Sequence, residues 1–92
     1  MKTIVQNLTF TVQVFREGSN FVSYNPELKV ASCGKNINEA KDNLKDALSG
    51  FLKSAKKMNT LEAIMEEAGF YYTKHKWLAP DLLVMDRLSL AI

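Results

Sequence analysis

The sequence predicts an α+β domain in which an antiparallel sheet of three N-terminal strands packs on one long helix. Alternating apolar residues over 8–15 indicate the first strand, and apolar residues at helical spacing over 37–55 indicate the helix. A second alternating stretch lies over residues 82–92. With a shorter helix between them the predicted order is β-β-β-α-α-β-β, and 92 residues fit a single domain.

The N-terminal part has the pattern of a β-hairpin followed by a third strand. Residues 17–20 supply turn chemistry between the strand at 8–15 and a returning strand at 21–24, because glycine and asparagine tolerate positive φ. Pro26 then interrupts the sheet, since it has no N–H to donate. A short third strand is expected over 28–32.

The long helix has the strongest local signal in the chain. Asn36 and Glu39 have the spacing of a capping box, in which each side chain satisfies a free N–H group. The apolar face of the helix comprises Ile37, Ala40, Leu44, Ala47, Leu48, Phe51 and Ala55. Gly50 inside this helix predicts the close approach of a neighbouring backbone.

The C-terminal third predicts a short helix and two strands. A second capping box begins at Asn59, the helix covers about 60–68, and Gly69 suits the left-handed position after its end. The strands are expected within residues 70–92, joined by a turn at 79–81.

Composition predicts a cytoplasmic protein. The formal net charge of +2 does not imply nucleic-acid binding through bulk charge. Cys33 is the one cysteine, so no disulfide can form within the chain, and no signal peptide is recognisable, which together indicate a reducing compartment. The longest aliphatic run, residues 82–85, is far shorter than the roughly 20 residues of a membrane helix, so no membrane association is expected.

Residues suited to catalysis or to metal binding are few. His75 lies between two lysines, as a solvated surface histidine does, and Cys33 at a strand end is expected to pack rather than react. One cysteine and one histidine do not make a zinc site, and neither a calcium-binding spacing nor a glycine-rich phosphate loop is present. The sequence therefore predicts no enzyme, no metal and no cofactor.

Lysines on the long helix leave a nucleic-acid-binding alternative open. Lys41, Lys45 and Lys53 are predicted to follow one exposed side of the helix, and a lysine stripe can track phosphates. The same pattern is also typical of the solvated face of an amphipathic helix. Residues 58–92 carry the opposite balance, with an excess of acidic side chains.

Four segments together carry a family resemblance. They are NFVSYNPEL at 20–28, VASCG at 30–34, NEA at 38–40 and NLKDAL at 43–48. Their order and spacing resemble the HicB-like antitoxin family over about residues 3–55. The resemblance implies a partial RNase H-like fold that is degenerate and not itself a nuclease.

The resemblance also implies a partner and a surface that binds it. The partner in that family is a HicA-like toxin, a small ribonuclease that cleaves mRNA, and the antitoxin shields its active site. The candidate toxin-binding residues are Phe15, Tyr24, Asn25, Pro26 and Glu27. The alternative is that the Pro26–Leu28 stretch is only a structural corner. A further alternative is an orphan, homo-oligomeric binding module with the same fold.

The chain departs from the family pattern in three ways. Cys33 stands where the family usually has a polar residue, the net charge is slightly positive, and no DNA-binding helix-turn-helix follows Gly69. DNA binding is therefore not expected. The C-terminal strands are expected to extend the sheet or to pair with a second copy, as a homodimer or a higher homo-oligomer.

Overall fold

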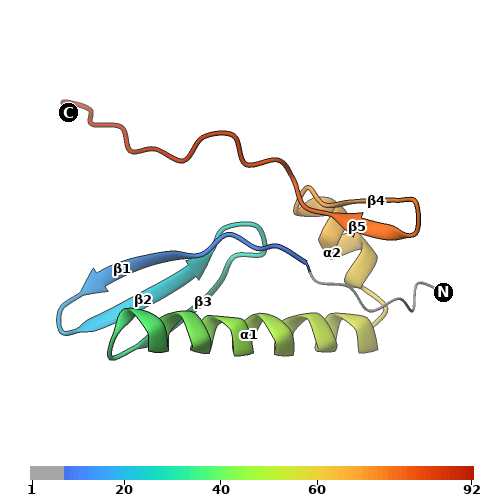
Figure 1. The fold of residues 1–92 in the computed structure, drawn as a ribbon, viewed down its shortest axis with the longest axis horizontal. Helices are drawn as coiled ribbons and strands as arrows, with labels where there is room; N and C mark the ends of the chain where they lie inside the picture. Colours follow the sequence, from blue (N-terminus) through green and yellow to red (C-terminus); the bar gives the residue numbers. More distant parts are fainter. Residues whose placement is uncertain (1–7) are drawn as a thin grey trace.

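The computed structural model describes residues 8–92, so the first residues of the predicted core at 3–55 lie outside the described part. An antiparallel sheet of three strands packs with one face on a long helix, and a second helix and a small hairpin follow (Figure 1). The fold class and the element order are as predicted. The elements are β1 (Gln13–Glu17), β2 (Asn20–Asn25), β3 (Val30–Gly34), α1 (Ile37–Lys57), α2 (Leu61–Glu67), β4 (Tyr71–Thr73) and β5 (Lys76–Leu78).

The first strand is shorter than the predicted 8–15. Glu17 pairs with Asn20 and Gln13 with Tyr24, so the β1–β2 turn has two residues and begins with Gly18 at φ 62°. Residues 8–12 precede β1 without a strand partner among the described residues, because β2 ends at Asn25, just before Pro26.

A hydrogen-bond hub at Asn25 replaces strand pairing for these residues. The Asn25 side chain is fully buried, and its Nδ2 donates to the Thr11 carbonyl at 2.8 Å and to Glu27 Oε1 at 2.7 Å. Its Oδ1 accepts from the Leu28 N–H at 2.8 Å, and Glu27 Oε1 also accepts from the Thr11 N–H at 2.7 Å. The hub therefore ties the N-terminal segment to the β2–β3 connection.

The sheet meets α1 closely near the start of the helix. Ser23 Oγ, fully buried, donates to the Ala40 carbonyl at 2.7 Å. A Cβ on Gly34 would lie 2.5 Å from the Ala40 nitrogen, so β3 reaches this position only with glycine. The prediction of a close approach at Gly50 is wrong, since that residue is exposed and nothing lies within 4 Å of where its Cβ would be.

The predicted apolar face of α1 is only partly buried. Ala40, Leu44, Leu48 and Ala55 are in the core, whereas Ile37 and Phe51 are 53% and 36% exposed. Both stay exposed because a three-stranded sheet covers a narrower stripe of the helix than the apolar pattern offers.

The capping prediction for α1 is confirmed at its start. Asn36 Oδ1 accepts from the Glu39 N–H at 2.8 Å, and Glu39 Oε1 accepts at 3.1 Å from the N–H of Lys35, one residue before the cap. At the other end, Asn59 takes φ 58°, and the Thr60 N–H donates to the Ala55 carbonyl at 2.9 Å. These are features of a Schellman motif.

Asn59 therefore ends α1 and does not cap α2, so the second predicted capping box is wrong. The N-cap residue of α2 is Thr60, which makes no side-chain capping bond. The prediction for Gly69 is confirmed: its φ is 94°, and the Phe70 N–H donates to the Met65 carbonyl at 2.9 Å.

The last strand lies earlier than predicted. Lys74 and His75 both have positive φ and make a two-residue turn between β4 and β5, so the turn expected at 79–81 is not a hairpin turn. Tyr72 pairs with Trp77, and their rings lie edge to face with the ring centroids 5.4 Å apart. Residues 79–92 have no regular secondary structure, and the strand expected over 82–92 is absent because no strand of the described chain lies beside it.

A second hydrophobic cluster joins the C-terminal elements to the rest. Met65, Phe70 and Trp77 are buried in it, and Leu52 of α1 packs against them. Phe10 reaches the same cluster, with its ring centroid 5.3 Å from that of Phe70. The segment anchored by the Asn25 hub thus connects the two parts of the core.

Replacing Asn25 is expected to destabilise the whole fold. Asn25→Ala leaves the Leu28 N–H and the Thr11 carbonyl without their buried partners and should lower the free energy of unfolding by about 2–4 kcal/mol. Urea denaturation followed by circular dichroism measures it. The control Asn38→Ala, at an exposed helical position, should change stability by less than about 0.5 kcal/mol. Equal effects of the two substitutions would contradict the role of the hub.

Two glycine-to-alanine substitutions are expected to have opposite signs. Gly34→Ala forces the β3 and α1 backbones apart and should cost about 1–3 kcal/mol. Gly50→Ala meets no atom and replaces a poor helix former, so it should stabilise by about 0.5–1 kcal/mol. Thermal unfolding of both variants tests the pair, and a stable Gly34→Ala variant would show that the approach is not tight.

Candidate protein-binding surface

The sheet has one face that no helix of the described chain covers. Ser23 and Gly34 point toward α1, so the residues that alternate with them in each strand point to the other side. The strand registers align these residues in two rows that cross all three strands. We call this the open face; its rows are Phe15–Val22–Cys33 and Gln13–Tyr24–Ala31.

The open face is apolar at its centre and accessible. Phe15 is 50% exposed, Ala31 and Cys33 are exposed, and Val22 and Tyr24 are half-buried between their neighbours. Figure 1 shows α1 on the opposite side of the sheet. Neither row carries a charged side chain, and a phenol and an amide supply the polar groups. A surface of this kind suits a protein partner, because aromatic side chains with a polar end are typical of interface cores.

The structure separates the five predicted toxin-binding residues. It brings Phe15 and Tyr24 together on adjacent rows of the open face, and it leaves Pro26 half-buried at the β2–β3 connection. Asn25 is fully buried on the helix side and is not available to a partner. Glu27 uses its carboxylate within the hub, as the structural-corner alternative for the Pro26–Leu28 stretch expects of this residue.

Sequence reasoning missed Val22, Ala31 and Cys33 as members of this surface. The turn expected at 17–20 already puts Arg16 opposite Phe21, so the pairing of Phe15 with Val22 could have been found from the turn alone. Cys33 was expected to pack, but it is exposed because its neighbour Gly34 takes the position facing α1.

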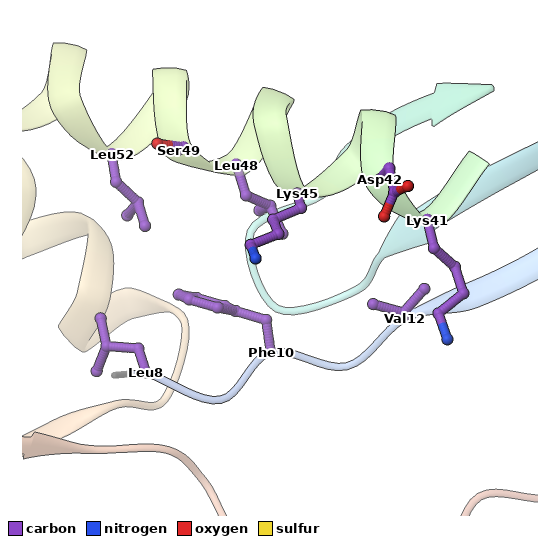
Figure 2. Close-up of a pocket in the computed structure, with 9 residues that line it drawn as sticks. All are labelled: Leu8, Phe10, Val12, Lys41, Asp42, Lys45, Leu48, Ser49 and Leu52. Atoms are coloured by element: carbon purple, nitrogen blue, oxygen red, sulfur yellow. The ribbon is translucent and has the colours of Figure 1, made fainter. Parts of the chain in front are cut away.

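The three lysines of α1 do not form one continuous stripe. Lys41 and Lys45 border a groove of about 500 Å³ between residues 8–12 and α1 (Figure 2). At 3.6 residues per turn, Lys53 lies about 120° around the helix from Lys41, and it does not line the groove. Asp42 stands between the two groove lysines, so the rim carries both signs of charge.

Within residues 8–92 there is no group of three or more potential metal ligands. His75 is exposed in the β4–β5 turn, as expected for a solvated histidine. Both helices of the described chain are too polar or too short to cross a lipid bilayer. The chain matches no protein-family model, no curated protein and no solved structure.

The thiol of Cys33 is expected to react without unfolding. Because it is exposed on the open face, a thiol reagent such as dithionitrobenzoate should modify it in native protein at a rate within about tenfold of that in urea. A native rate lower by several orders of magnitude would mean that the open face is covered in solution.

Proposed function

We propose that this protein is the antitoxin of a toxin–antitoxin pair and acts in the cytoplasm by binding a HicA-like, mRNA-cleaving toxin and shielding its active site. The observation that carries the proposal is the open face: two largely apolar rows without a charged side chain, which cross all three strands of a sheet whose other face packs on α1. In this proposal the protein needs no catalytic group, metal or cofactor of its own.

Two of the three strands of the open face are built by segments that resemble the HicB-like family. The NFVSYNPEL segment forms β2 and the corner with Asn25 and Glu27, and VASCG forms β3. NEA and NLKDAL lie in α1, where Ala40 and Leu44 support the sheet from behind. The resemblance therefore falls on residues that shape or support this surface, and this supports its use for binding.

The open face is also held rigid before any partner arrives. A two-residue turn sets the register of β1, and the Asn25 hub anchors the chain that leads into it. A preorganised surface loses little conformational freedom on association, which favours tight binding. With Val22 and Tyr24 on the central strand and Phe15 beside them on β1, the face can contribute to an interface of standard size, about 800 Å² on each partner.

The nucleic-acid alternative has less support. Of the three lysines, only Lys41 and Lys45 act together, and they share their groove with Asp42 and several apolar side chains. A phosphate-tracking surface needs a run of uncompensated cations.

The test is co-expression with the small protein encoded beside this one. We expect that neighbour to arrest growth alone, and growth to resume when this chain is co-expressed and co-purifies with it. Phe15→Glu and Ala31→Glu each put a charge on the open face and should weaken the complex by at least about 100-fold, measured by calorimetry.

Two controls make the result specific. Met58→Glu changes a 69% exposed apolar side chain outside the open face and should bind as the unmodified chain does. Lys41→Glu with Lys45→Glu should also leave toxin binding unchanged. A neighbour that is neither toxic nor co-purified would refute the proposal, and salt-dependent retention of RNA lost in the double lysine variant would favour the alternative.

A further inference from the structure

The last residues of the chain are apolar, extended and uncovered. Residues 81–92, which we call the C-terminal segment, follow β5 and pair with no strand of the described chain (Figure 1). Every residue in the segment is exposed, and its large apolar side chains are exposed by 54% to 119%: Leu82, Leu83, Val84, Met85, Leu88, Leu90 and Ile92. So many apolar side chains in one exposed stretch mark an interaction site.

The accessible surface of the chain has the size expected for a chain that lacks a partner. It exposes 7528 Å², whereas a compact folded chain of 10.4 kDa exposes about 5,400 Å². Its radius of gyration is 15.2 Å, against about 12 Å for a compact domain of this length. The excess of roughly 2,000 Å² is what one partner contributes to a large obligate interface.

The groove between residues 8–12 and α1 has the features of a binding site for an extended apolar segment. Leu48 and Leu52 point from α1 toward Phe10 and Val12, which form its opposite wall (Figure 2). Thr11 directs its N–H and carbonyl to the Asn25 hub, so in an extended chain those of Phe10 and Val12 point away from it. The groove therefore combines an apolar wall with backbone groups free to pair with an added strand.

β1 is the edge of the sheet that remains open for such pairing. On the opposite edge, the Cys33 carbonyl of β3 accepts from Asn43 Nδ2 at 2.8 Å, which blocks part of that edge.

The alternation of the C-terminal segment fits this groove. Its even-numbered positions are apolar except for Asp86, whereas its odd-numbered positions are polar or small except for Leu83 and Met85. The even positions would therefore face the groove, with Asp86 near Lys41 and Lys45 on the rim, while Arg87, on the opposite face of the segment, would point to solvent.

The segment does not occupy the groove of its own chain. It and α1 lie on opposite sides of the sheet, whereas the groove opens on the α1 side (Figure 1). We propose that the C-terminal segment of a second copy lies in this groove along residues 8–12, and that the exchange is reciprocal, which gives a closed dimer with twofold symmetry.

This dimer leaves the open face free, because the groove lies on the other side of the sheet. Segment exchange and toxin binding therefore use different residues. A result that refutes the dimer does not refute toxin binding, and a result that refutes toxin binding does not refute the dimer.

The first test is the solution mass of the full chain by light scattering at roughly 100 μM, where we expect twice 10.4 kDa. Leu88→Lys with Leu90→Lys should weaken the dimer by about 100-fold or more, since two buried leucines are lost from the groove. The matched control Ser89→Lys with Ala91→Lys adds the same charge to the same segment at the odd positions and should remain dimeric.

The second test uses complementation. Val12→Lys damages the groove but not the segment, and the Leu88/Leu90 variant damages the segment but not the groove. Each alone should be monomeric with an unchanged circular dichroism spectrum, and their mixture should form a heterodimer visible by native mass spectrometry. A monomeric full chain, a dimer that survives the Leu88/Leu90 change, or a mixture that stays monomeric would each overturn the proposal.

Discussion

The fold depends on one buried asparagine. Asn25 has no exposed surface and makes three hydrogen bonds, to Thr11 in the N-terminal segment and to Glu27 and Leu28 in the β2–β3 connection. Its amide is suited to this position because it supplies two donors and an acceptor from one planar group. A buried polar group is tolerated only when its bonds are satisfied, so the conformations of the N-terminal segment and of the β2–β3 connection are determined together.

The hub also explains how a 92-residue chain joins two hydrophobic clusters. Ala40, Leu44 and Leu48 fill the space between the sheet and α1, and the Met65–Phe70–Trp77 cluster lies beyond it. Residues 8–12 pass between the two, and Phe10 touches the second cluster through Phe70. Because residues 8–12 form no strand, the side-chain bonds to Thr11 and the packing of Phe10 on Phe70 hold this segment in place.

Much of the fold could be predicted from the sequence because its signals are local. The capping box at Asn36 and the left-handed position at Gly69 depend on neighbours only a few residues away. Predictions failed where a distant part of the chain decides the outcome. The extent of β1 depends on where Pro26 ends β2, and the tight glycine is Gly34 because of Ala40, not Gly50. Alternation over 82–92 indicates a strand, but no partner strand exists in the described chain.

The candidate surface was predictable only in part, for the same reason. Phe15 and Tyr24 could be chosen as exposed aromatics from their place in the pattern, and the structure puts them on one face. Asn25 and Glu27 looked equally suited to a partner, because polarity alone does not show whether a side chain is already bonded within the fold. Only the position of Thr11 in the folded chain shows that the side chains of Asn25 and Glu27 are already bonded.

The two-residue turn at Gly18 and Ser19 has a consequence for how this surface can change over generations. Turn length sets the register of β1, and side chains alternate along a strand. A single inserted residue that shifted the register would move Phe15 to the helix side and bring Val14 and Arg16 to the exterior. A change in loop length can therefore replace the side chains of the open face by others of different chemistry, without a substitution in any strand.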